Sequence, residues 1–221
     1  LNIWQAKGGA VQTVTARDRS KITIAEYVEK PLPEKKKQAK KQRSKKAQPA
    51  QRIKTKIKLP FSAEWAYYDS NTAPALDWKS ASFNDSKWKK GHGQFGFGDN
   101  DEKTTLQFNK KSPEQTLTYY FRKKIQFSPE ESKMSITMEI IYDDGAVIYI
   151  NGRELKRINL PEKELTHSTQ AYRTSKDNLR ANITVPKGFF LTGDNSIAIE
   201  VHNSSRRSPD ISFDATLSIG Q

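Results

Sequence analysis

Two adjacent carboxylates, Asp143 and Asp144, precede a glycine and a short apolar segment. Carboxylates serve as general acids and bases, and their hard oxygens are ligands that Ca2+ prefers. Adjacent side chains of an extended strand point to opposite faces, so joint acid–base work would require a distorted backbone. We therefore predict no catalytic pair. Two alternatives stay open: a ligand or metal role, with Asp143 as a calcium ligand, or carboxylates that accept hydrogen bonds from loop N–H groups and hold the turn.

A second acidic group, Asp99-Asn100-Asp101-Glu102, follows Gly96 and Gly98. Ca2+ takes roughly six to eight oxygen ligands, and acidic residues in a glycine-rich loop can supply several. The spacing differs from that of an EF-hand loop. Asp99 and Asp101 are thus candidate calcium ligands, with a solvated acidic turn as the alternative, and Ca2+ is the one cofactor that the sequence indicates.

Glu200 and His202 lie two positions apart in the alternating segment Ser196 to His202. Residues at this spacing share one face of a strand, and Ile199 and Val201 share the other. A buried glutamate requires a partner, for which Arg122, Arg206 and Arg207 are the candidates. The pair is either a structural ion pair or part of a ligand site.

The segment after this strand, His202 to Asp210, is predicted to be an end loop that carries two arginines. Its candidate ligand-binding residues are His202, Arg206, Arg207 and Asp210. Sugar binding also needs an aromatic face for the C–H side of the ring, which Trp78 could supply. The alternative for Trp78 is packing between sheets, as is common for tryptophan in small sandwiches.

The elements that must position these residues are short strands. Asn151-Gly152 is a two-residue hairpin signal after the strand Ala146 to Ile150, because a type I′ turn needs positive φ at both central positions. Six further strands are predicted, at Trp65 to Tyr68, Thr116 to Phe127, Met134 to Tyr142, Asn182 to Val185, Ser196 to His202 and Ile211 to Ile219. No stretch has a sustained helical period, so we predict an all-β antiparallel sandwich of jelly-roll type.

The positive charge is concentrated in one segment. Residues 35–58 hold twelve basic and no acidic residues, which leaves +1 of the net +13 for the rest of the chain. Residues 31–58 are predicted to be a disordered Lys-rich linker before the module at 59–221, because they bury too little to offset their ordering entropy. Polyanion binding through the linker is an alternative, with the candidate residues Lys40, Lys41, Arg43, Lys45 and Lys46. No aromatic residue lies among these lysines, which disfavours nucleic acid as the partner.

Several function classes find no support in the sequence. There is no cysteine, so thiol chemistry and disulfides are excluded. No P-loop, nucleophile elbow or HExxH motif is present, so we predict no enzyme within this chain and no catalytic residue. No apolar run approaches the roughly 20 residues that span a bilayer. The chain starts at Leu1 in a strand-like pattern, as expected of a fragment or processed product.

Seven motifs in order give residues 59–221 a family likeness: W-x-Y-Y-D at Trp65, F-N-D-S-K-W at Phe83, G-F-G-D at Gly96, Y-Y-F-R-K at Tyr119, Y-D-D-G-A-V-I-Y-I-N-G at Tyr142, G-D-N-S-I-A-I-E-V-H at Gly193 and S-P-D-I-S-F-D at Ser208. This order resembles a galactose-binding-like β-jelly-roll module of exported bacterial proteins, often appended to calcineurin-like or purple-acid-phosphatase-type metallophosphoesterases. Residues 1–30 are more loosely similar to the closing strands of such an enzyme, and would then be the end of an upstream β-rich domain.

The resemblance implies a non-catalytic accessory module of an exported multidomain protein, located outside the cell, in the periplasm or on the cell surface. Its expected partner is a glycan or cell-surface polysaccharide. One alternative is a structural or docking domain at the C-terminus of a secreted metallophosphoesterase, whose upstream catalytic domain would be the partner. The other is polyanion binding through the basic linker.

Overall fold

The predicted hairpin is present in the computed structural model, which describes residues 55–108, 115–175 and 178–220. Strand β8 (Gly145–Ile150) pairs with β9 (Arg153–Ile158), and Ile150 lies opposite Arg153. The connecting Asn151 and Gly152 have φ of 52° and 78°. Both values are positive, as a type I′ turn requires, and this explains why Asn-Gly occupies the turn.

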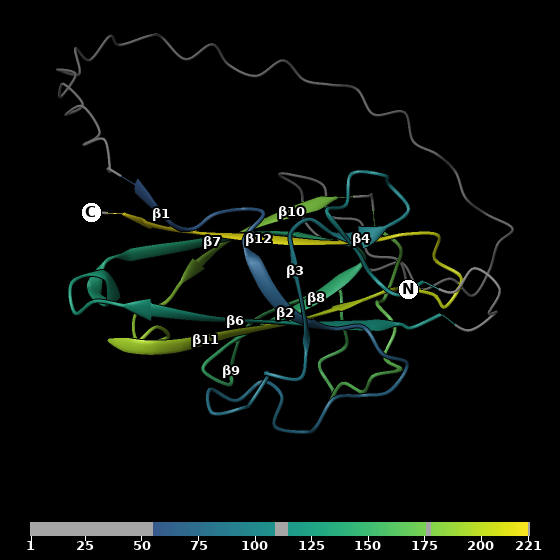
Figure 1. Cartoon of the computed structure of the whole chain (residues 1–221), viewed down its shortest axis with the longest axis horizontal. Helices are drawn as coiled ribbons and strands as arrows, with labels where there is room; N and C mark the ends of the chain where they lie inside the picture. The colour runs from purple at the N-terminus through teal and green to yellow at the C-terminus, as the bar shows by residue number, and fades with distance from the viewer. Residues whose placement is uncertain (1–54, 109–114, 176–177, 221) are drawn as a thin grey trace, which may run out of the picture. The chain divides into compact units, whose positions relative to one another are not determined.

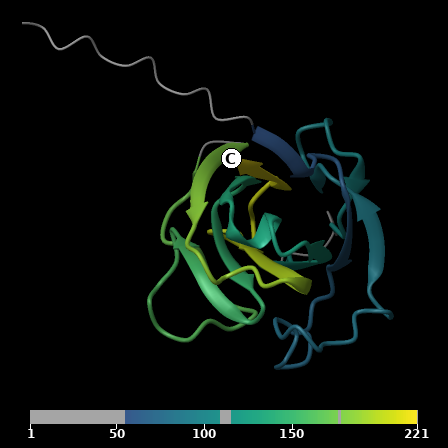
Figure 2. The same ribbon diagram turned by 90° about the vertical axis from the view of Figure 1, so that its left-hand side faces the viewer.

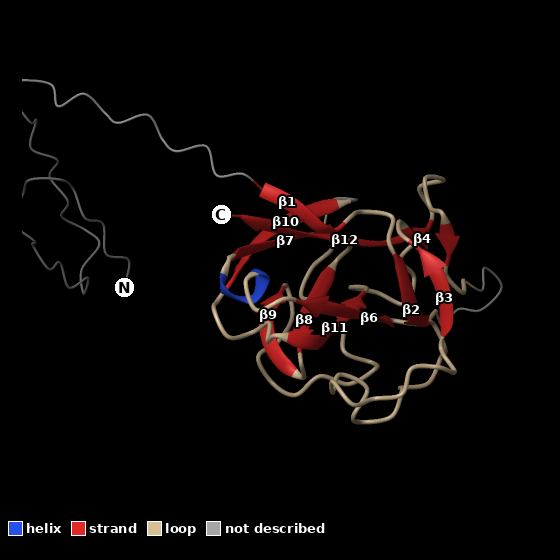
Figure 3. Cartoon of the chain, turned by 60° about the vertical axis from the view of Figure 1, so that its left-hand side comes forward, coloured by secondary structure: helices blue, strands red, loops and turns tan. Residues whose placement is uncertain are grey.

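The chain divides into two compact units, 1–49 and 50–221, and the described residues all belong to the second. The remaining elements are one short helix, η1 (Glu131–Lys133), which Figure 3 shows in blue, and ten strands. The strands are β1 (Thr55–Leu59), β2 (Glu64–Tyr68), β3 (Lys89–His92), β4 (Phe95–Phe97), β5 (Thr104–Thr105), β6 (Thr118–Phe127), β7 (Ser135–Tyr142), β10 (Leu179–Val185), β11 (Gly193–His202) and β12 (Ile211–Gly220). Among these residues, no helix has the length and apolar character needed to cross a membrane.

The strands form two sheets, which Figure 1 shows as two layers and Figure 2 shows from one end. One sheet has the order β10-β7-β12-β4-β5, with β1 also paired to β12, and the other has the order β3-β2-β6-β11-β8-β9. The β4–β5 pair is parallel and the other pairs are antiparallel. From β6 onward the chain crosses repeatedly between the sheets. The predicted antiparallel β-sandwich of jelly-roll type is therefore confirmed.

The main core lies between the two sheets and is rich in aromatic rings. Trp65 from β2 meets Phe213 from β12 edge to face, with ring centroids 5.3 Å apart, and Phe121 from β6 stacks on Phe213 at 4.0 Å. Ile199 and Val201 of β11 are fully buried in this core. The alternation predicted for Ser196 to His202 therefore places its apolar side chains between the sheets and its polar side chains on the opposite face of β11.

That opposite face carries a second, smaller cluster. The segments 69–88 and 159–175 run along the outer side of the β6–β11 sheet. Trp78 and Leu160 of these segments pack against Tyr120 and Tyr149 of the sheet. Because loops cover this face, both faces of β11 are buried from Asn195 to His202, and Glu200 is buried with them.

The sandwich begins earlier than the predicted module boundary at Leu59. β1 pairs with the last residues of β12 from Thr55 onward, within the range predicted as linker. Lys58 of β1 lies 2.6 Å from a carboxylate oxygen of Glu131, so part of the basic segment contributes to a strand with its own ion pair. Residues 31–54 of the predicted linker, and residues 1–30, lie outside the described residues.

Candidate functional site

A cleft of about 870 Å3 opens beside β4. Figure 1 shows β4 at one end of the sandwich. Three parts of the chain line it: the stretch from Phe97 to Phe108, Gln115 just before β6, and residues 206–209 between β11 and β12. Binding sites for small molecules are commonly concave spaces of roughly 300–1,000 Å3, lined by aromatic groups with a few polar ones. The cleft therefore has the size of a ligand site.

One wall of the cleft is aromatic. The rings of Phe97 and Phe108 stack with centroids 4.1 Å apart and an interplanar angle of 23°. Phe97 is buried and Phe108 is half-buried, so Phe108 is the more accessible of the two rings. Such a ring can pack against the C–H face of a sugar.

The other lining residues are mostly polar. They supply a carboxylate, amides, hydroxyls and two guanidinium groups: Glu102, Asn100, Gln115, Thr105, Ser208, Arg206 and Arg207. Arg206 is half-buried and donates hydrogen bonds to the Gln115 carbonyl at 3.0 Å and the Ser168 hydroxyl at 3.4 Å. These contacts fix the position of one guanidinium group in the cleft wall.

The loop that carries both arginines is anchored where it leaves β11. The N–H of Asn203 donates to the Leu117 carbonyl at 2.8 Å, and the N–H of Ser204 donates to Asp144 Oδ2 at 2.7 Å. The other carboxylate oxygen of Asp144 accepts from the Ser175 N–H at 2.6 Å. Asp144 thus holds two loops through one buried carboxylate, and Asp143 accepts from the Ser175 hydroxyl at 3.1 Å.

Gly98 allows the two sides of the cleft to meet. Its φ is +113°, and an added Cβ would lie 2.7 Å from the Asp210 Cβ and 2.9 Å from the Pro209 carbonyl oxygen. Any larger residue would be strained in this backbone conformation and would push the 206–210 loop away. Close packing against the 206–210 loop therefore explains why Gly98, the second glycine of the G-F-G-D motif, has no side chain.

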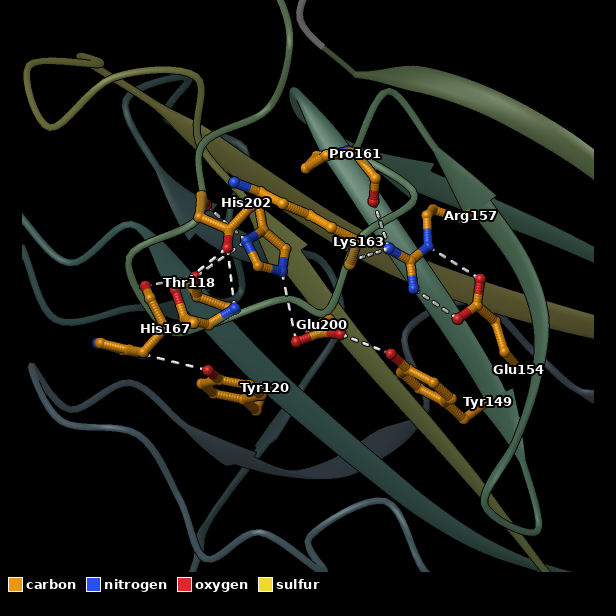
Figure 4. Close-up of polar contacts among 12 residues, drawn as sticks. Thr118, Tyr120, Tyr149, Glu154, Arg157, Pro161, Lys163, His167, Glu200 and His202 are labelled. Carbon is orange, nitrogen blue, oxygen red and sulfur yellow. Dashed lines mark hydrogen bonds and ion pairs between the residues drawn. The ribbon is translucent and has the colours of Figure 1, made fainter.

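Glu200 and His202 form a buried polar network on the outer face of the β6–β11 sheet (Figure 4). Glu200 accepts a hydrogen bond from the Tyr149 hydroxyl at 2.8 Å, and its other oxygen lies 3.4 Å from Nε2 of His202. That second contact is an ion-pair distance without well-directed hydrogen-bond geometry. The expected arginine partner is corrected here: Glu200 contacts a tyrosine and a histidine, while Arg122 pairs with Asp85 at 3.0 Å.

The network continues to the loop that covers it. Nδ1 of His202 lies 2.8 Å from the Thr169 carbonyl, which can only accept, so this nitrogen donates. The Thr118 hydroxyl donates to the His167 carbonyl at 2.8 Å, and His167 stacks on Tyr120 (Figure 4). His202 is fully buried, so it is not exposed in the loop as the ligand prediction required. The network attaches the 159–175 loop to the sheet.

Burial controls the ionisation of this cluster. Burial raises the pKa of Tyr149 and of Tyr120 well above the usual tyrosine range, and the nearby Glu200 carboxylate raises both further. Burial also lowers the pKa of His167, with smaller contributions from His202 and Arg206. The tyrosines are therefore neutral hydroxyl donors, and His167 is favoured in its neutral form.

Lowering the pH is expected to destabilise the protein through His167. A lowered pKa in the folded state means that the unfolded chain binds the proton more tightly. The stabilising contribution is present above the ordinary pKa of 6.5 and is lost as the pH falls through the lowered value. Thermal unfolding between pH 7.5 and 5.5 should show a falling Tm, and His167→Gln should reduce that fall. An unchanged pH dependence in this variant would contradict the assignment.

Trp78 does not lie in the cleft. Its side chain is buried among Trp88, Tyr120 and Tyr149, with the Tyr120 centroid 4.9 Å away. Aromatic neighbours surround the ring, so the structure gives it a packing role instead of the predicted ligand contact. Asp210 lies beside the cleft, where it accepts from the Ser208 hydroxyl at 3.0 Å.

The candidate calcium ligands accept hydrogen bonds from other residues of the protein. Asp99 accepts from Ser212 and Asn178, and Asp101 accepts from Gln94, whereas Asp143 lies in the turn before β8. Within residues 55–108, 115–175 and 178–220, no three His, Asp or Glu side chains gather closely enough to hold a metal ion. Calcium binding stays a prediction. The proposed polyanion residues, Lys40 to Lys46, lie outside the described residues.

The sequence predicted only part of the cleft. Arg206 and Arg207 line it, as the end-loop prediction required, but Phe97, Phe108, Glu102 and Gln115 were not predicted as site residues. A signal existed for Phe97, which is the aromatic residue of G-F-G-D. Phe108 carried none, because its contact with Phe97 depends on the path of the intervening residues.

Comparisons with known proteins show the fold and no family. No protein-family model matches the chain, and no curated protein matches it. Among solved structures, a Bacteroides uniformis beta-glucuronidase is similar, with 14% identity, a TM-score of 0.51, and coverage of 76% of this chain and 18% of the other. A beta-glycosidase from Bacteroides vulgatus has 15% identity, a TM-score of 0.50, and coverage of 74% and 20%. This chain therefore corresponds to about a fifth of each glycosidase. Neither similarity is to the phosphoesterases expected from residues 1–30.

Proposed function

We propose that this chain is a non-catalytic, glycan-binding domain of a larger carbohydrate-active protein, and that its cleft is the binding site. The observation that carries the proposal is the cleft itself, whose lining combines the stacked Phe97–Phe108 pair with polar side chains. An aromatic ring beside fixed hydrogen-bonding groups is what a sugar, with its C–H face and hydroxyls, requires.

Two further observations support a binding role. The 203–210 loop is held by backbone hydrogen bonds to Leu117 and Asp144, so little ordering would be needed on binding. The glycosidases of similar fold are carbohydrate-active proteins in which a domain of this size is a minor part. The proposal keeps the location predicted from the sequence, outside the cell or in the periplasm, where glycans are exposed.

The two alternative functions rest on other residues. Docking to an upstream phosphoesterase depends on residues 1–30, and polyanion binding depends on Lys40 to Lys46. Both ranges lie outside the described residues, so these alternatives stay predictions.

Removal of the accessible aromatic ring should weaken glycan binding. We expect Phe108→Ala in the full chain to lower affinity about tenfold, which corresponds to one aromatic contact of about 1.4 kcal/mol. The measurement is a glycan array followed by calorimetry on the best-bound oligosaccharide. The matched control is Tyr172→Ala, because Tyr172 is 66% exposed and does not line the cleft.

Three outcomes would count against the proposal. Retained affinity in Phe108→Ala would place binding elsewhere, as would an equal loss in Tyr172→Ala. A wild-type chain that binds no glycan on the array would end the proposal altogether. Circular dichroism of both variants must show the wild-type fold, since Phe108 is half-buried and its loss carries some cost in stability.

A further inference from the structure

The cleft contains two arginines that form no ion pair with a carboxylate of the described residues. Arg122, Arg157 and Arg180 each pair with an acidic side chain. Arg206 and Arg207 do not: across the described ranges of the chain, neither forms an ion pair with Asp or Glu. Arg206 and Arg207 thus differ from Arg122, Arg157 and Arg180 in having no acidic partner among the described residues.

The partners of Arg206 are neutral oxygen atoms. Its two hydrogen bonds go to a carbonyl and a hydroxyl, which orient the guanidinium without cancelling its charge. A guanidinium has five N–H donors, so donors remain for another acceptor. Arg207 follows in the same loop with an exposed side chain, and its backbone N–H is held by the Ser205 hydroxyl at 3.1 Å.

The charges of the cleft also limit the charge of its ligand. Among the described residues that line the cleft, two arginines and the single carboxylate of Glu102 leave a formal charge of +1. A single carboxylate balances this charge, whereas a group with several negative charges would exceed it. The planar fork of arginine also matches the two oxygens of a carboxylate.

We propose that the cleft prefers a sugar that carries one carboxylate, such as a uronic acid, and that Arg206 and Arg207 bind that carboxylate while Phe108 packs against the ring. This rests on the proposed glycan-binding function and goes beyond it by naming the ligand class. Arg206 is the positioned group, and Arg207 is the exposed group that a mutation can remove with little effect on the fold.

The test compares three forms of one oligosaccharide against the full chain by calorimetry: the uronic acid, its neutral methyl ester and a phosphorylated counterpart, whose phosphate carries about −1.5 to −2 charges at pH 7. We expect the acid to bind about tenfold more tightly than the ester, because a charge-assisted hydrogen bond is lost on esterification. Arg207→Gln should abolish most of that difference, because it weakens binding of the acid. Arg173→Gln is the matched control, since it removes the same charge from an exposed loop position outside the cleft.

The basic segment requires a control of its own, because lysines attract any anionic glycan. A variant in which Lys40, Lys41, Arg43, Lys45 and Lys46 are replaced by glutamine should retain the preference for the acid over the ester. Loss of the preference in this variant would overturn the proposal, as would equal binding of acid and ester, or binding of the phosphorylated form as tight as that of the acid. Equal binding of acid and ester would still leave the glycan-binding function in place, whereas binding of no form would end both.

Discussion

Replacing Arg122 with methionine is expected to lower the free energy of unfolding by about 3 kcal/mol, because it removes one partner of a buried ion pair. The guanidinium is fully buried on the outer face of β6, and its Nε lies 3.0 Å from Asp85 Oδ2. It also donates to the Trp78 carbonyl and lies over the ring of Phe83, with 5.1 Å between Cζ and the ring centroid. Without it, the 69–88 segment loses its main polar attachment to the sheet.

A lysine on the same carboxylate provides the matched control. Lys124 Nζ lies 3.8 Å from Asp85 Oδ1 and its side chain is 63% exposed. An exposed pair of this kind contributes roughly 0–1 kcal/mol, so Lys124→Met should change stability by less than about 1 kcal/mol. Urea unfolding of both variants measures the difference. Similar losses of unfolding free energy in the two variants, or a loss under about 1 kcal/mol for Arg122→Met, would show that burial does not strengthen the Arg122–Asp85 ion pair.

Asp144→Ala is expected to cost about 3 kcal/mol as well, since it leaves two partly buried backbone N–H groups without an acceptor at about 1–3 kcal/mol each. The groups belong to Ser175 and Ser204, at 2.6 and 2.7 Å from the two carboxylate oxygens. Asp144→Asn should fall between alanine and wild type, because the amide keeps one oxygen and turns an NH2 group toward the other donor.

The same variants should affect the cleft, because Ser204 begins the loop that carries Arg206 and Arg207. Glycan affinity should fall in the order wild type, asparagine, alanine, in step with stability. The control is Asp194→Ala, an exposed carboxylate that accepts from Gln126 at 2.8 Å, with an expected change below about 0.5 kcal/mol. Asp144→Ala with wild-type stability would contradict the role given to this carboxylate.

Local rules predicted the strands that carry this architecture. Asn151-Gly152 fixed the β8–β9 hairpin because few dipeptides accept positive φ at two successive positions. Strict alternation placed Glu200 and His202 on one face of β11 and Ile199 and Val201 on the other. Alternation alone did not indicate that loops cover the polar face, so the sequence left open which pair faced the main core.

Predictions that depended on distant contacts were less successful. The stretch around Gly96 and Gly98 was predicted to be a glycine-rich loop, yet it contains β4, because pairing of Phe95–Phe97 with β12 outweighs the local preference of glycine for turns. For Trp78 the sequence left a ligand contact and packing both open, because the rings of Tyr120 and Tyr149 that pack against it come from β6 and β8. The cleft joins Phe97 and Phe108 to Arg206 across about a hundred residues, a separation that no motif spans.

We propose that the cleft between the 97–108 stretch and the 206–209 loop binds glycan. The most direct measurement is NMR titration of the isotopically labelled full chain with the oligosaccharide that binds best on the array. We expect the amide shift changes to concentrate at Gly98 to Leu106 and at Arg206 to Ser208, and we expect Phe108→Ala to make these changes smaller at the same glycan concentration. Shifts confined to the Lys-rich segment 35–54, or to the loops over Trp78, with the cleft amides unmoved, would contradict it.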